Sequence, residues 1–318
     1  MAILITGAGL VGSQIARLEL DRGNNPVLMD IAFQTATLAK FFDVNRVRFF
    51  EGDVLNPLDL AKVIKEEKIT RVIHTAAYPM LTVGAQQKPY PAIQMNIMGT
   101  VNILEAARIF ELERVVFCSS NVLYLHMIGG EDCGAELKEE AYPRPASIYA
   151  STKQACENLG LNYTWYGVDF VAVRFSAVFG PWQGLGGGGG PSHLFREMLE
   201  KSLRGEESTF HRRTLEWVYS KDAAQGAVKA CHIEGLKSRV FNISMGETYD
   251  GLEVASIVKR LIPRAKVKID ELPKGIGPSP KEIKEPLDLA RSRSELGYEP
   301  EYKMQEATQD YIKFLEAG

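Results

Sequence analysis

A tyrosine and a lysine four residues apart carry the clearest chemical signal of the sequence. Tyr149 and Lys153 enclose the segment Tyr-Ala-Ser-Thr-Lys, and on a helix this spacing puts both side chains on one face. A nearby ammonium stabilises a phenolate, so Lys153 would lower the pKa of Tyr149 from about 10 toward the working pH. Tyr149 could then take the proton from a substrate hydroxyl while a hydride leaves the same carbon, and return that proton in the reverse direction.

The position of this pair in the chain sets it apart from the surface Tyr-x-x-x-Lys pairs that are common in proteins. The pair opens a predicted helix, and the strand before that helix, residues 115–118, leads into Ser119 and Ser120. The carboxyl edge of a parallel sheet is where ligands bind in α/β folds. We therefore predict that Ser120 contacts the substrate oxygen beside Tyr149, and that Ser120, Tyr149 and Lys153 form a catalytic set.

A glycine-rich turn between a strand and a helix could hold the hydride acceptor. Gly7, Gly9 and Gly12 fit the pattern G-x-G-x-x-G, in which the backbone approaches a pyrophosphate and the helix N-terminus faces it with free N–H groups. The alternative is a tight strand-to-helix turn without a ligand. The residues that we predict to contact a dinucleotide here are Gly7, Gly9, Leu10, Val11 and Gly12.

An acidic residue at the end of the second predicted strand supports the dinucleotide. Asp30 follows Gly12 by eighteen residues, close to the roughly 20 expected for the acid that binds the ribose hydroxyls. A carboxylate there repels a 2′-phosphate, and the next basic residue is Lys40, so we predict NAD rather than NADP as the cofactor. Asp53 and the adjoining Val54 could meet the adenine, although a turn or N-cap aspartate explains Asp53 equally well. Lys153 could also hold the nicotinamide ribose.

The elements that must position these residues alternate between strand and helix. The predicted strands cover residues 3–6, 26–30, 48–53, 71–74, 115–118 and 170–174. Helical apolar spacing occurs at Val11, Ile15 and Leu18, along Ile93, Ile97, Val101 and Leu104, and in residues 149–166. This pattern predicts an α/β fold of the Rossmann type, a doubly wound parallel sheet with a smaller C-terminal substrate-binding lobe. We expect residues 1–175 to bind NAD, with late segments around 211–245 returning to that domain, and residues 176–318 to form most of a discontinuous lobe.

Three irregular stretches interrupt the regular pattern, at residues 125–145, 179–191 and 273–286. Long loops in compact domains are usually functional or mobile, so we expect them to help build the lobe. Residues 186–190 are five consecutive glycines, and the loop 184–190 is a candidate lid over the substrate. The alternative is an unconstrained surface connection.

Composition limits the partners that the chain can have. Its 318 residues carry 37 basic and 40 acidic side chains, a net charge of −3, without the basic excess that nucleic-acid or membrane surfaces need. No apolar run approaches the roughly 18 residues that span a bilayer. The four cysteines are scattered and neither they nor the histidines have metal-site spacing, so we expect reduced thiols, no metal and a cytoplasmic protein.

In these motifs and their order the chain resembles the extended short-chain dehydrogenase/reductases, the NAD-dependent epimerase/dehydratase family, over nearly its whole length. The matching stretches are residues 3–12, 72–77, 96–107, 119–124, 145–153, 174–181, 287–288 and 295–298. The resemblance implies NAD as cofactor, Ser120, Tyr149 and Lys153 as the catalytic set, and Thr75, Ala76, Ala77 and Asn96 as cofactor or backbone contacts. Asn96 could equally be a helix-stabilising side chain. The resemblance also implies homodimers formed through the helices that start near residues 92 and 149.

Several positions depart from the family pattern. The glycine loop is one residue shorter than the usual G-x-x-G-x-x-G. Asn121 and Val122 follow Ser120 where 4,6-dehydratases carry Asp-Glu, which argues against dehydration. Ala177 and the segment Leu215-Glu216-Trp217 stand where nucleotide-sugar enzymes often carry Asn and Arg-Asp-Phe, which help to hold a diphosphate. Arg212 and Arg213 could substitute, or form an exposed basic turn.

These observations predict an NAD-dependent oxidoreductase or epimerase that moves a hydride at a secondary alcohol of a sugar or nucleotide-sugar-like substrate. One alternative is an NAD-dependent dehydrogenase of a non-nucleotide substrate such as a sugar acid. Another is a non-catalytic NAD-binding redox sensor, although such proteins usually lack the Tyr or the Lys. A structural or RNA-bound role gains no support from the net charge. The residues predicted to contact substrate are Tyr78, Asn121, His126, Ser176 and Arg213.

Overall fold

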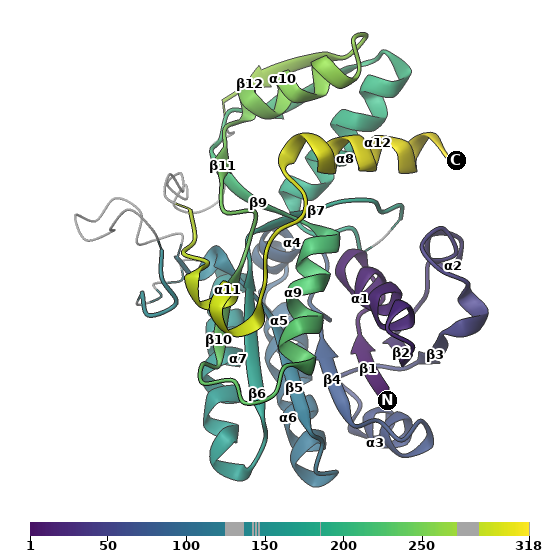
Figure 1. Cartoon of the computed structure of the whole chain (residues 1–318), viewed down its shortest axis with the longest axis vertical. Coiled ribbons are helices and arrows are strands. Elements are labelled where there is room, and N and C mark those ends of the chain that lie inside the picture. Colours follow the sequence, from purple (N-terminus) through teal and green to yellow (C-terminus); the bar gives the residue numbers. More distant parts are fainter. Residues whose placement is uncertain are drawn as a thin grey trace.

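The computed structural model describes residues 1–124, 137–141, 143, 145, 147–184, 186–271 and 286–317. A parallel sheet with seven strands, in the order β10-β6-β5-β4-β1-β2-β3, forms its centre (Figure 1). The bounds of these strands are β1 Ala2–Thr6, β2 Asn25–Asp30, β3 Arg48–Glu51, β4 Arg71–His74, β5 Arg114–Ser120, β6 Phe170–Phe175 and β10 Val240–Ile243. The predicted Rossmann-type parallel sheet is thereby confirmed.

The strands form where the sequence has short apolar runs. Every residue of β4 and of β6 is buried, as expected for strands that are covered on both faces. The third strand ends at Glu51, two residues before the predicted end. The seventh strand, β10, comes from late in the chain and pairs with β6 at the edge of the sheet.

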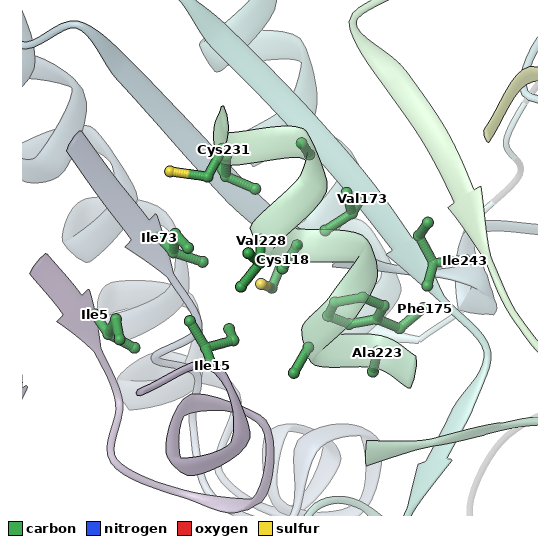
Figure 2. Close-up of a cluster of buried hydrophobic side chains, with 14 of the residues drawn as sticks. Ile5, Ile15, Ile73, Cys118, Val173, Phe175, Ala223, Val228, Cys231 and Ile243 are labelled. Atoms are coloured by element: carbon green, nitrogen blue, oxygen red, sulfur yellow. The ribbon is translucent and has the colours of Figure 1, made fainter. Parts of the chain in front are cut away.

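Helices cover both faces of the sheet and create two hydrophobic cores. On one face lie α1 Leu10–Asp21, α9 Ser220–His232 and α11 Ala290–Leu296, and on the other α3 Pro57–Glu66, α6 Gly99–Ile109 and α7 Ile148–Tyr163. Figure 2 shows the first core, in which Ile5, Ile73, Cys118 and Val173 of the sheet meet Ile15 and Val228 of the helices. Asn56 caps α3 by accepting a hydrogen bond from Leu58 N at 3.1 Å.

One helix differs from the prediction. The apolar spacing of Ile93, Ile97, Val101 and Leu104 indicated a single long helix, but α5 Pro89–Ile93 and α6 are joined by a π-helical segment, η2 Gln94–Met98. A π-turn adds one residue to a helix without changing its apolar face enough for a periodicity argument to detect it. The extra residue falls at the segment that contains Asn96.

Shorter helices complete the part of the chain around the sheet. They are α2 Thr35–Leu38, α4 Leu81–Gln87, η1 Val44–Arg46, η3 Asn121–Tyr124 and η4 Thr164–Tyr166. Among the described residues, no helix combines the length and the apolar character that crossing a membrane would require.

The remaining elements pack around a third core, which includes Phe179, Phe195, Trp217 and Tyr311. They are the strands β7 Ala177–Phe179, β8 Glu207–His211, β9 Leu215–Tyr219, β11 Thr248–Tyr249 and β12 Lys266–Asp270, and the helices α8 Gly190–Arg204, α10 Gly251–Leu261 and α12 Met304–Glu316. In Figure 1 these elements lie beyond the sheet, at the end opposite to the N-terminus and therefore toward the carboxyl end of β1. The predicted division into an NAD-binding domain, residues 1–175, and a substrate-binding lobe formed mostly by residues 176–318 stays a prediction.

Candidate functional site

The three predicted catalytic side chains meet between α7 and the end of β5. Helix α7 begins just after Ser147, whose hydroxyl accepts a hydrogen bond from Ala150 N at 3.1 Å. This start puts Tyr149 and Lys153 on the buried face of α7, at 5% and 3% exposure. Ser120 is the last residue of β5, and its hydroxyl lies near enough to the Tyr149 phenol to lower the pKa of that group.

The electrostatics of this cluster differ from the expectation. Burial raises the pKa of Tyr149 above its ordinary value, with smaller contributions from Cys118 and Cys156, while the hydrogen bond with Ser120 lowers it. Lys153 Nζ donates to the carbonyl oxygen of Cys118 at 2.7 Å, and burial lowers the pKa of Lys153. The lowering of the Tyr149 pKa that the sequence predicts is therefore not found among these side chains, because desolvation of the phenol dominates.

A third side chain on the same face of α7 was missed by the sequence analysis. Glu157 lies one turn after Lys153 and accepts a hydrogen bond from the hydroxyl of Ser119. Arg174 of β6 binds both carboxylate oxygens of Glu157, with its Nη2 2.6 Å from Oε2 and its Nε 3.0 Å from Oε1. Two features of the sequence could have indicated this pair. Glu157 follows Lys153 by four residues, and Arg174 is a charged residue within an apolar strand. Tyr149, Lys153 and Glu157 thus attach three successive turns of α7 to the last three residues of β5.

The glycine loop has the tight geometry that its sequence pattern predicts. Gly7 has a φ of +89°, and a Cβ on it would lie 2.7 Å from Thr75 Oγ1 and 2.9 Å from Ala76 N. A Cβ on Gly12 would lie 1.9 Å from the carbonyl oxygen of Gly7. Thr75 holds the loop from the neighbouring strand end by donating to the carbonyl oxygen of Thr6 at 2.8 Å. Side chains at Gly7 and Gly12 would fill the space that lets α1 start directly above the end of β1.

Asp30 and Asp53 have different local roles. The Asp30 carboxylate accepts a hydrogen bond from Ala8 N at 2.7 Å through Oδ2, which brings it against the glycine loop. Asp53 accepts from Leu55 N at 2.9 Å through its side chain, the turn role that was the alternative to an adenine contact. Val54, at 5% exposure, is buried beside it, and its carbonyl oxygen accepts from Asn102 Nδ2 at 2.9 Å.

Buried polar side chains connect the cofactor loop to the catalytic helix. Asn96 accepts from Tyr78 N at 2.8 Å and donates to Thr152 Oγ1 at 2.9 Å, so it joins the segment after β4 to α7. His74 lies between Thr6 and Thr100, with ring-to-hydroxyl distances of 2.6 and 3.1 Å. Burial, aided by the charge of Lys153, lowers the pKa of His74 to about 3, so the imidazole is neutral.

The structure describes most, but not all, of the residues that we predicted to contact substrate. Tyr78 follows β4, and Asn121 opens η3 directly after Ser120. Ser176 lies between β6 and β7, and its buried hydroxyl has no hydrogen-bond partner among the described residues. Arg213 lies between β8 and β9. His126 falls outside the described residues, as does the greater part of the irregular stretches 125–145 and 273–286.

Glu216 lies in the segment Leu215-Glu216-Trp217, which departs from the family pattern. Its side chain is 1% exposed and accepts hydrogen bonds from Ser244 Oγ at 2.5 Å and from Leu287 N at 3.0 Å. Burial raises the pKa of Glu216 to about 7, although both hydrogen bonds lower it. Glu216 therefore connects β9 to the segments after β10 and before α11.

Residues 3–244 match the model of the family described as "NAD dependent epimerase/dehydratase family". The chain is 26% identical to UDP-glucose 4-epimerase of Lacticaseibacillus casei over 322 residues, covering 94% of this chain and 91% of that protein. The crystal structure of Thermus thermophilus UDP-glucose 4-epimerase in complex with NAD has a TM-score of 0.83 at 25% identity and covers 100% of both chains. A partial-consensus L-threonine 3-dehydrogenase, which shares the fold, has a TM-score of 0.84 at 22% identity and also covers 100% of both chains.

Proposed function

Because the chain belongs to the NAD-dependent epimerase/dehydratase family, we propose that it transfers a hydride reversibly at a secondary alcohol of a sugar or nucleotide-sugar-like substrate. Tyr149 is the general acid–base of this reaction, and Ser120 and Lys153 complete the catalytic set. The observation that carries the proposal is the burial of Tyr149 and Lys153 on one face of α7 against the end of β5, where Lys153 Nζ donates to the carbonyl oxygen of Cys118 at 2.7 Å and Ser120 is the last residue of the strand.

The glycine loop suits the cofactor of the family. Gly7 and Gly12 leave no room for a Cβ, and the start of α1 presents the backbone N–H groups of Leu10 and Val11. Asp30, already held against the loop by Ala8 N, would bind the adenosine ribose hydroxyls. NAD bound here would supply the hydride acceptor.

The chain's own residues would then manage the proton. Ser120 orients the substrate oxygen toward the Tyr149 oxygen, and Tyr149, acting in its ionised form, takes the hydroxyl proton as the carbon is oxidised. The same proton returns from Tyr149 when the carbonyl is reduced. Asn96 holds the segment that contains Tyr78 against α7, which keeps the wall of the site in place. In an epimerase the reduction occurs on the opposite face, whereas in a dehydrogenase NADH leaves.

A specific observation favours the second candidate, a dehydrogenase of a non-nucleotide substrate such as a sugar acid. Ala177 and Leu215 are apolar at positions where family members often bind a diphosphate. Glu216 of β9 already accepts hydrogen bonds from Ser244 and Leu287 inside the protein. Arg212 is exposed. A substrate without a diphosphate would need none of the missing contacts.

The 340 nm absorbance of the protein with NAD and a panel of sugars, sugar acids and nucleotide sugars tests the two candidates. An increase with one compound would identify a dehydrogenase and its substrate class. A new sugar isomer, detected by NMR without an increase in absorbance, would identify an epimerase that recycles NAD. A 4-keto-6-deoxy product would contradict the prediction, based on Asn121 and Val122, that the protein is not a 4,6-dehydratase.

We also infer how the parts of the chain share this work. Residues 1–175, with late segments around 211–245 returning to them, would hold NAD, and residues 176–318 would form most of the lobe that holds the substrate. Two copies of the chain would pair through α5, α6 and α7. The contact of α5 and α6 with α7 within one chain supports a continuous helical surface for this pairing.

A further inference from the structure

The five glycines at residues 186–190 lie against the glycine loop that the proposed function assigns to NAD. The carbonyl oxygen of Gly186 accepts a hydrogen bond from Leu10 N at 3.0 Å. A Cβ on Gly9 would lie 2.6 Å from that same oxygen. The two glycine-rich segments are therefore in backbone contact, which a side chain on Gly9 would prevent.

The N–H that Gly186 occupies is one that a dinucleotide needs. Leu10 is the first residue of α1, so its N–H has no acceptor within the helix. In Rossmann-type folds these amides bind the cofactor pyrophosphate. A carbonyl oxygen that accepts from Leu10 N has its partial negative charge where a phosphate oxygen would lie. Gly186 and a pyrophosphate therefore compete for one donor.

The glycine run joins two fixed points. On one side, Trp182 is 1% exposed and stacks on Phe41 with ring centroids 6.2 Å apart. On the other, α8 begins at Gly190 and buries Phe195 in the third core. Between them, Gly186 and Gly188 have φ angles of +82° and +92°. Glycine changes between such conformations and ordinary ones at little steric cost, so the run can move while its ends stay in place.

We propose that residues 186–190 form a strap that closes on Leu10 and must release this amide before a dinucleotide binds. This proposal rests on the proposed function, because it takes the glycine loop as the NAD site. The strap lowers the affinity for NAD and favours its exchange. Exchange is what a dehydrogenase needs at every turnover, whereas an epimerase that retains NAD does not need it.

Gly186→Ala tests the strap. Alanine is disfavoured at a φ of +82°, and its Cβ would lie 3.3 Å from Gly9 Cα, so the closed strap is destabilised. We expect NAD and ADP-ribose to bind about fivefold more tightly, the effect of roughly one unfavourable left-handed residue, and adenosine to bind unchanged because it lacks the pyrophosphate. The measurements are calorimetric titration for the equilibrium and stopped-flow NADH fluorescence for the association rate.

Gly205→Ala is the matched control. Gly205 also has a positive φ, +72°, but a Cβ there would meet nothing within 4 Å, and it caps the far end of α8. Gly188→Ala provides a second strap variant, should Gly186→Ala fail to fold in a thermal melt. If the strap variants bind NAD no better than Gly205→Ala, or release it faster, the proposal is wrong while the NAD site stands. If the unaltered protein binds neither NAD nor ADP-ribose, the proposed cofactor site is wrong, and the strap with it.

Discussion

At the scale of single residues, the proposed chemistry depends on one hydroxyl group. Tyr149→Phe removes the proton acceptor but keeps the ring packed on α7. We expect turnover of the substrate found in the absorbance panel to fall by about 10²–10⁴-fold, with NAD affinity nearly unchanged. Tyr163→Phe is the matched control, because Tyr163 lies on the same helix and its hydroxyl bonds to Glu105 at 2.7 Å, away from β5. Equal activity of the two variants would favour the redox-sensor alternative.

Cofactor choice is a second property that one residue would set. Asp30→Ala removes the carboxylate that repels a 2′-phosphate, and we expect the preference for NADH over NADPH to fall by at least about tenfold. Asp53→Ala should leave the ratio unchanged, because Asp53 is engaged in a turn with Leu55 N. Both affinities can be measured by NADH and NADPH fluorescence. An unchanged ratio in Asp30→Ala would remove Asp30 from the proposed ribose site.

At the scale of elements, Glu157 fixes α7 against two strands, because it pairs with Arg174 of β6 and accepts a hydrogen bond from Ser119 of β5. Glu157→Gln leaves Arg174 charged at 5% exposure, and breaking such a pair costs about 3–5 kcal/mol. We expect that loss in urea unfolding, and a lower turnover because the hydroxyls of Ser120 and Tyr149 lose their alignment.

Two further variants separate this effect from general destabilisation. Adding Arg174→Met to Glu157→Gln removes the unpaired charge and should recover part of the stability. Glu105→Gln also breaks an ion pair and a bond to α7, but at an exposed site, where such pairs contribute at most about 1 kcal/mol. If Glu105→Gln and Glu157→Gln unfold alike, the buried pair has no special role.

The carboxyl of Glu216 predicts a pH dependence. The pKa of Glu216 rises from its ordinary value of 4.5 to about 7 in the folded protein. Between pH 4.5 and pH 7 the folded state therefore binds a proton that the unfolded state lacks. The free energy of unfolding therefore falls as pH rises through this window, by about 3 kcal/mol as an upper bound. Glu216→Gln cannot lose a proton and should gain stability over the unaltered protein between pH 5 and pH 8.

Urea unfolding of both proteins at pH 5 and pH 8 measures that gain. Glu206→Gln, an exposed change between α8 and β8, serves as the control and should show no such trend. A difference between Glu216→Gln and the unaltered protein that stays constant with pH would mean that Glu216 does not titrate in this window.

The sequence predicts an element well when that element depends on local patterns, and poorly when it depends on contacts with other parts of the chain. The strands and the glycine loop were predictable because apolar runs and the geometry of Gly7 and Gly12 act locally. The π-helical segment around Asn96 was not, because one inserted residue leaves the apolar spacing almost intact. The pair of Glu157 and Arg174 depends on how α7 packs against β6, which local sequence patterns do not indicate.

At the scale of the whole molecule, contacts between distant segments were the least predictable. The sequence marked the five glycines as a lid over substrate or a plain connection, yet Gly186 contacts Leu10, far away in the chain. Local sequence patterns do not indicate a contact between residues so far apart in the chain. The departures at Ala177 and Leu215 were visible, but the inward role of Glu216 depends on Ser244 and Leu287, which come from other parts of the chain.

The distribution of exposed apolar side chains bears on assembly. Single exposed apolar residues are ordinary, but more than half of the large ones in the described part of the chain lie on α4 to α6 or just after α7. These residues are Val83, Tyr90, Ile93, Met98, Ile109, Trp165 and Tyr166. Exposed apolar side chains gathered on one group of helices are typical of a protein interface, and this group includes the helices for which the family resemblance implies a homodimer.

We therefore expect a dimer, with twice the mass of one chain in sedimentation equilibrium. Tyr90→Asp combined with Met98→Asp places two charges at positions that are 76% and 47% exposed in the single chain. In a dimer these charges would be buried without partners, so the variant should sediment as a monomer. Leu252→Asp, on α10 and 43% exposed, should stay dimeric. An unaltered protein that sediments as a monomer at micromolar concentration would show that this surface has another use.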